Sequence, residues 1–193
     1  MKKKAIVLGA LVAATAAQAS EPATSPFYVT AAAGTTRLNA DCAGTTSCDN
    51  TGAGGKLVFG YNLGNGFSLE GSYINFGKAH ASTPPIAGTP AGTITLKPSA
   101  LVVGGAYALP LGGDWGMAAR LGVAQVKTRT NFSYGVQNGD AAESETRLVA
   151  GVSVSYALNG NVKLEFGVDT SKAQMHGLKG NVRLVSLGAS FAF

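Results

Sequence analysis

The chain has 193 residues, enough for one domain, and only 13% of them are charged, whereas soluble domains average about 25%. Its formal net charge is +5, but the charges are scattered and form no basic run. The sequence therefore lacks the basic patch that indicates a nucleic-acid partner. Beyond the N-terminal segment, no apolar run approaches the roughly 18 residues of a membrane-spanning helix.

The N-terminal segment has the pattern of an export signal. Three lysines at 2–4 precede a short apolar run at 5–16, and Ala17-Gln18-Ala19 fits the A-x-A cleavage pattern. We therefore predict that residues 1–19 are a signal peptide and that residues 20–193 form one mature domain. The mature domain then holds 12 Lys and Arg against 10 Asp and Glu, so it is almost neutral.

The two cysteines, Cys42 and Cys48, lie in the stretch DCAGTTSC. An exported chain meets an oxidising compartment, where a nearby pair of thiols forms a disulfide. A structural zinc ion is bound by four ligands, so two cysteines alone favour a disulfide over a metal site. The disulfide would stabilise the fold by about 2–3 kcal/mol. We expect no metal site and no cofactor.

Eight segments alternate apolar residues with small or polar ones, which is the period of a β-strand. The predicted strands are 27–38, 55–63, 67–77, one within 95–111, 115–130, 146–158, 162–174 and 182–193. Several reach ten residues or more, and a tilted membrane-spanning strand needs about 9–11.

Short and long connections alternate between these strands. Tight hairpin turns are predicted at 64–66, 112–114 and 159–161, from their Gly and Asn residues. Longer polar loops are predicted at 39–54, 78–94, 131–145 and 175–181. Short turns on one side and long loops on the other are typical of an outer-membrane barrel.

The two faces of each strand differ in the way that a barrel in lipid requires. In 162–169, Val162, Leu164, Phe166 and Val168 share one face, and the other face carries Lys163, Glu165, Gly167 and Asp169. A soluble barrel would place its large apolar residues inside and its charges outside. Here the strand charges are too few to coat an outer surface, so the large apolar face is expected to contact lipid.

Aromatic residues gather at the strand ends beside the short turns and the chain termini. We predict that they form a girdle at the periplasmic interface, where amphipathic rings prefer to lie. The girdle comprises Phe27, Tyr28, Tyr61, Phe67, Tyr107, Trp115, Tyr156 and Phe191, with Phe193 at the chain end.

The A-x-A signal, the eight alternating strands, the three tight turns and the terminal Phe193 together resemble the OmpA-like and OmpX-like family of small outer-membrane β-barrels. The stretches FYVTAAAG and SLGASFAF resemble the family's opening and closing strands. The resemblance implies an all-β fold, an eight-stranded antiparallel up-and-down transmembrane β-barrel. It also implies that Phe193 is the signal read by the barrel-assembly machinery, but it does not extend to the peptidoglycan-binding domain of OmpA itself.

Four charged residues are expected on the lumen side of the strands: Glu70, Arg120, Lys163 and Glu165. Each follows a tight turn by a few residues, so they should lie at similar depths, and their formal charges cancel. A buried charge must be paired or hydrated, so we predict an internal salt-bridge network that plugs the barrel. The alternative is a gate, in which an exchange of partners opens a small water path.

The function expected from these features is a structural or surface-interaction role, with loops displayed from the outer membrane of a Gram-negative cell. A narrow gated pore for ions or very small solutes is the alternative. A lipid-modifying enzyme is less favoured, because His80 and Ser82 lack an orienting third group. The expected partners are outer-membrane lipid, the assembly machinery and surface ligands of the loops, and we expect a monomer.

Overall fold

A computed structural model describes residues 26–39, 47–83, 92–134, 137–175 and 178–193, and every regular element in these ranges is a β-strand. Among them, no helix is long and apolar enough to cross a membrane. The strands are β1 (Phe27–Asn39), β2 (Ser47–Asp49), β3 (Thr51–Gly64), β4 (Phe67–Asn75), β5 (Ala79–Thr83), β6 (Gly92–Gly112), β7 (Trp115–Tyr134), β8 (Gln137–Ala157), β9 (Val162–Met175) and β10 (Leu178–Ala192).

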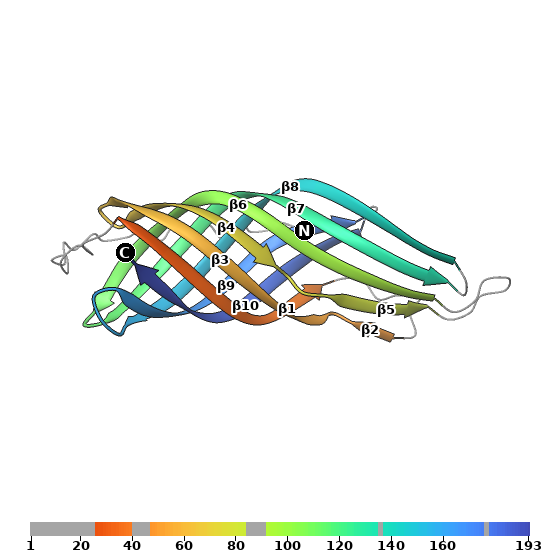
Figure 1. The fold of residues 1–193 in the computed structure, drawn as a ribbon, viewed down its shortest axis with the longest axis horizontal. Helices are drawn as coiled ribbons and strands as arrows, with labels where there is room; N and C mark the ends of the chain where they lie inside the picture. Colours follow the sequence, from red (N-terminus) through yellow and green to blue (C-terminus); the bar gives the residue numbers. More distant parts are fainter. Residues whose placement is uncertain (1–25, 40–46, 84–91, 135–136, 176–177) are drawn as a thin grey trace, which may run out of the picture.

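Eight of these strands close into a barrel, as the sequence predicts (Figure 1). The ring runs β1-β3-β4-β6-β7-β8-β9-β10, and β10 pairs with β1 in antiparallel register from Tyr28↔Ala192 to Asn39↔Asn181. β2 and β5 pair with each other and continue β3 and β4 beyond the ring. Closure leaves no unpaired edge in the lipid-facing part of the sheet, which a membrane-spanning sheet requires.

Three tight turns lie together at one end of the barrel, here called the turn end. The β3–β4 turn places Gly64, Asn65 and Gly66 at positive φ, a conformation that Gly and Asn adopt most readily. The β6–β7 turn uses positive φ at Gly112 and Gly113. In the β8–β9 turn, the Asn159 side chain accepts hydrogen bonds from the backbone N–H groups of Asn161 and Val162. The opposite end is called the hairpin end.

The strands run further toward the hairpin end than the sequence predicts. The segment 131–145, expected to be a loop, is mostly paired strand, with register contacts from Asn131↔Asp140 to Tyr134↔Gln137. The expected loop at 78–94 likewise contains β5 and the start of β6. The prediction was wrong because it followed apolar alternation, whereas backbone hydrogen bonds extend a hairpin into water with polar residues on both faces.

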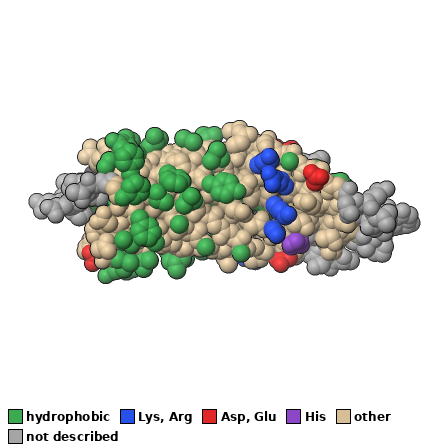
Figure 2. All heavy atoms as spheres, viewed as in Figure 1, with side chains coloured by type: hydrophobic (Ala, Val, Ile, Leu, Met, Phe, Trp, Pro, Cys, Tyr) green, Lys and Arg blue, Asp and Glu red, His purple; other side chains and the backbone are tan. Residues whose placement is uncertain are grey.

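The outer surface of the barrel is apolar. Leu101, Val103, Leu121, Leu148 and Leu187 are each 62–67% exposed, although they lie in the middle of long strands. Figure 2 shows hydrophobic side chains spread over the turn-end part of the visible face. A surface this apolar is a membrane surface, because soluble proteins rarely expose contiguous apolar patches larger than a few hundred Å².

The lumen is filled by two layers of different chemistry. Toward the hairpin end lies an apolar cluster of Ile74, Phe76, Ala100, Val102, Ala124, Val126, Val149, Val182 and Leu184. Toward the turn end lie buried polar and charged side chains, among them Thr30, Ser68, Glu70 and Glu165, together with the apolar Val58 and Ala106. The sequence pattern predicts mainly small residues inside, yet the larger Ile74 and Leu184 are almost completely buried there.

Candidate functional site

A cluster of five charged side chains crosses the lumen. Lys56 extends from β3, Glu70 from β4, Arg120 from β7, and Glu165 and Asp169 from β9. Because successive residues of a strand point to opposite faces, Glu165 and Asp169 share the inner face of β9. We call these five residues the lumen charge cluster.

Arg120 joins three strands across the barrel. Its Nε lies 3.0 and 3.1 Å from the two carboxylate oxygens of Glu70, and its Nη2 lies 2.9 Å from Oε2 of Glu165. Its Nη1 donates to the Ser153 hydroxyl at 2.7 Å. A planar guanidinium can bind several acceptors at once because its donors form a rigid fork.

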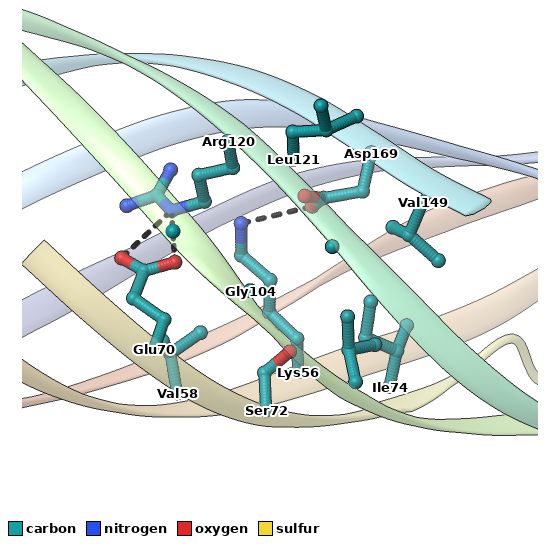
Figure 3. Close-up of a pocket in the computed structure, with 13 residues that line it drawn as sticks. Lys56, Val58, Glu70, Ser72, Ile74, Gly104, Arg120, Leu121, Val149 and Asp169 are labelled. Atoms are coloured by element: carbon teal, nitrogen blue, oxygen red, sulfur yellow. Dashed lines mark hydrogen bonds and ion pairs between the residues drawn. The ribbon is translucent and has the colours of Figure 1, made fainter.

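Lys56 continues the cluster on the other side of Glu165. Its Nζ lies 2.8 Å from Oδ2 of Asp169 and 3.5 Å from Oε1 of Glu165. Figure 3 shows Lys56 directed at Asp169 and Arg120 directed at Glu70. Gly151 leaves the space that Asp169 needs, since a Cβ at this position would overlap Oδ1 of the carboxylate.

The cluster is buried and carries unequal numbers of the two charges. Its side chains are only 2–12% exposed, and three carboxylates face two cations. A cavity of about 30 Å³ beside it has room for about two water molecules. Buried charges cost several kcal/mol each unless paired, so the strands that hold these groups constrain one another.

The structure brings together three of the four residues that the sequence placed in a lumen network. Arg120 contacts both Glu70 and Glu165, but Lys163 is exposed, and its place is taken by Lys56. The expectation of a common depth fails because Lys163 is only the second residue of β9 and therefore lies at the mouth of the barrel. The predicted network had a net charge of zero, whereas the observed lumen charge cluster has one more carboxylate than it has cations.

The sequence contained a signal for both residues that were missed. Asp169 alternates onto the same face as Glu165, four positions along β9. Lys56 precedes the alternating apolar residues Leu57, Phe59 and Tyr61 and so belongs to the opposite, inner face.

Tyr28 lies inside the barrel rather than in the aromatic girdle. Its hydroxyl donates to Oε1 of Glu70 at 2.5 Å and lies 3.1 Å from the Ser68 hydroxyl. Since Phe27 points outward, its neighbour on the strand must point inward. The ring of Tyr28 covers Gly60, where an added Cβ would overlap the ring.

The other predicted girdle residues lie at the turn end, on the outer surface. Three cross-strand pairs are in ring contact, with centroids 4.6–5.0 Å apart: Phe27–Tyr61, Phe67–Tyr107 and Trp115–Tyr156. Phe191 is 49% exposed and Phe193 is 66% exposed. The contacts arise because the members of each pair are direct register partners on neighbouring strands.

The predicted disulfide lies partly outside the described residues. Cys42 is outside them, and Cys48 belongs to β2. The disulfide therefore stays a prediction. His80, on β5, has its Nδ1 3.0 Å from the hydroxyl oxygen of Thr95 on β6.

An antiparallel barrel closed by β1 and β10, apolar outside and polar or tightly packed inside, defines an integral outer-membrane β-barrel. The chain belongs to the outer membrane protein beta-barrel domain family, whose model matches residues 5–193. It is thus a β-barrel protein of the Gram-negative outer membrane and of the OmpA-like and OmpX-like type. Comparison with curated proteins finds no match.

Several solved structures share this fold. Neisserial surface protein A (NspA) is 18% identical, with 88% of this chain and 98% of that chain covered and a TM-score of 0.55. The attachment invasion locus protein Ail of Yersinia pestis, in complex with the heparin analogue sucrose octasulfate, is 14% identical over 86% and 97% of the two chains, with a TM-score of 0.55. A major outer membrane protein from Thermus thermophilus is 16% identical over 88% and 100%, with a TM-score of 0.51.

Proposed function

We propose that this barrel acts at the cell surface through the strand hairpins that extend beyond its ring, and that it has no enzymatic role. The observation that carries the proposal is the length of the β7–β8 hairpin. β8 pairs with β7 from Gln137 onward, but in the described residues it pairs with β9 only from Val149. A polar hairpin of this length is not needed to span the membrane, and it offers surface to a partner.

The lumen supports a surface role more than a transport role. The apolar cluster around Ile74 and Val102 fills the barrel on the hairpin-end side of the lumen charge cluster. An eight-stranded barrel has an interior just wide enough for its own side chains.

A deletion strain separates the surface role from a purely structural one. It should be complemented either with the native barrel or with a variant in which residues 130–141 are replaced by a tight Asn-Gly turn, which leaves Arg129 in place. We expect both barrels to restore the integrity of the outer membrane, measured by uptake of a hydrophobic dye. Only the native barrel should restore adhesion to host-cell or abiotic surfaces.

Equal adhesion by the native and the shortened barrel would contradict a surface role for this hairpin. The matched control has the hairpin residues 137–141 scrambled at constant length and composition. The amounts of all three proteins in the outer membrane must be equal for the comparison to hold.

We further propose that the chain is exported with cleavage after Ala19 and works as a monomer surrounded by outer-membrane lipid. The closed ring supports the monomer, since the described strands of the ring are all paired within one chain. The apolar outer face supports the contact with lipid.

Phe193 is proposed as the address read by the barrel-assembly machinery. Its backbone N–H donates to the carbonyl of Phe27 at 3.2 Å, so the chain end is held at the turn end of the β1–β10 seam with its ring exposed. We expect Phe193→Ala to lower the amount of folded barrel in cells several-fold while refolding in detergent is unchanged. Heat-modifiable gel migration measures both quantities.

The matched control is Phe191→Ala, which removes an exposed aromatic ring two positions before Phe193, near the end of β10. An equal loss of folded barrel with this control would mean that Phe193 acts only as an interfacial anchor.

A further inference from the structure

The outer surface carries a row of basic side chains at the hairpin-end border of the apolar face. We call it the basic row, and it comprises Arg37 on β1, Lys78 between β4 and β5, Lys97 on β6, Lys127 and Arg129 on β7, and Arg183 on β10. All are exposed except Lys97, which is half-buried. Figure 2 shows Lys and Arg side chains aligned across the visible face, between the hydrophobic surface and the hairpin end.

The row lies one membrane thickness from the aromatic residues of the turn end. Arg37 lies ten positions after Phe27 on β1, and Lys97 lies ten positions before Tyr107 on β6. At a rise of about 3.3 Å per residue and a tilt of about 40°, ten residues span about 25 Å along the membrane normal. This equals the height of the apolar band of an outer-membrane barrel, so the row lies at the level of the lipid headgroups.

The row contains like charges directly opposite one another. Arg37 is the register partner of Arg183, and Lys97 is the register partner of Arg129, each pair on the outward face. Lys127 lies diagonally across from Lys97 on the same face. Like charges in such positions destabilise a sheet, and these pairs occur on opposite walls of the ring, β1–β10 and β6–β7.

Within the described ranges, no carboxylate relieves this repulsion. The other register neighbours of the paired residues are Thr51, Thr170 and Ala142. Among the residues that the structure describes, no member of the row forms an ion pair. Of the carboxylates in the described part of the chain, the outward Asp49 and Asp140 lie further toward the hairpin end, and Asp49 accepts the backbone N–H of Thr51.

We propose that each of these two basic pairs binds the phosphate of a lipid headgroup in the leaflet that faces the hairpin end. A phosphate between two cations turns the repulsion into charge-assisted hydrogen bonds, and the guanidinium fork matches its oxygens. A lipid is the occupant because its headgroup lies at this depth, while its chains cover the apolar surface directly below. The site is separate from the hairpins to which the surface role is assigned.

The test compares lipid retention by the purified full-length mature barrel and its variants. Nanodiscs contain either phosphatidylcholine alone or phosphatidylcholine with a bisphosphorylated lipid A, and native mass spectrometry counts the lipids that remain bound. We expect the native barrel to retain phosphorylated lipid. Each Lys or Arg near an anionic membrane surface raises the affinity for that surface about fivefold. Retention should therefore fall more than tenfold in the fourfold variant Arg37→Gln/Arg183→Gln/Lys97→Gln/Arg129→Gln.

The control variant is Lys163→Gln, which removes an exposed cation at the turn end and should leave retention unchanged. Arg37→Gln alone should leave or raise the melting temperature in phosphatidylcholine, where only repulsion is lost. It should lower the melting temperature in the lipid A nanodiscs, where a phosphate ligand is lost.

Equal retention by the native barrel and the fourfold variant would overturn the proposal, as would an equal loss with Lys163→Gln. If inorganic phosphate in the buffer stabilised the native barrel in phosphatidylcholine as strongly as lipid A does, the site would be one for free phosphate. That result would also overturn the proposal of a lipid.

Discussion

Replacing Arg120 by Ala is expected to lower the free energy of unfolding by about 3–5 kcal/mol, the usual cost of removing one partner from a buried ion pair. The loss is large because Glu70 remains buried without a cation and Glu165 keeps only Lys56, whose Nζ lies 3.5 Å from it. Urea unfolding of the barrel in lipid vesicles measures it, with the fluorescence of the single tryptophan, Trp115, as the signal.

Lys163→Ala is the matched control, since it removes a cation from the mouth of the same barrel. We expect its unfolding free energy to stay within about 0.5 kcal/mol of the native value, as for other surface substitutions. The double variant Arg120→Met/Glu70→Gln should be more stable than Arg120→Met, because removal of both charges leaves one fewer orphaned carboxylate. A change below about 1 kcal/mol for Arg120→Ala would mean that water already satisfies the cluster.

The same variant tests the pore alternative by planar-bilayer recording. Conduction by the native barrel, increased by Arg120→Ala, would support a gate at the lumen charge cluster. We expect neither barrel to conduct, because the apolar cluster around Ile74 and Val102 fills the lumen on the hairpin-end side of the lumen charge cluster.

The barrel itself was predictable because its signal is local and repeated. Alternation with a period of two fixes which residues of a strand face outward, and Gly and Asn mark the tight turns. The same rule assigns Lys56 and Asp169 to the inner face, yet it does not say which inward residues meet. Contact depends on how the tilted strands are staggered around the ring, which is why Lys163 was expected in a cluster that it does not reach.

The hairpin end was less predictable for a related reason. Above the membrane both faces of a hairpin meet water, so the alternation that marks a strand disappears while backbone pairing continues. Residues 137–145 therefore resemble a loop in composition and form a strand in the structure. The basic row was missed because its like-charged partners, such as Arg37 and Arg183, are far apart in the sequence and meet only when the barrel closes.

Leu121→Arg is expected to lower the free energy of unfolding in a lipid bilayer by about 2–4 kcal/mol, the cost of an arginine at the midplane of a barrel's lipid face. Leu121 is 63% exposed and lies on β7 midway between Trp115, at the turn end, and Lys127, in the basic row. Its side chain points away from the lumen, so the cost reports the lipid alone.

Thr93→Arg is the matched control, because Thr93 is exposed near the start of β6, beyond the basic row, where an arginine remains in water. We expect the unfolding free energy of this variant to equal that of the native barrel. In a detergent that admits water around the barrel, the penalty at Leu121 should shrink, because the arginine no longer has to leave a polar medium. Equal stability of both variants in the bilayer would contradict a lipid-facing β7, since it would place the middle of that strand in water.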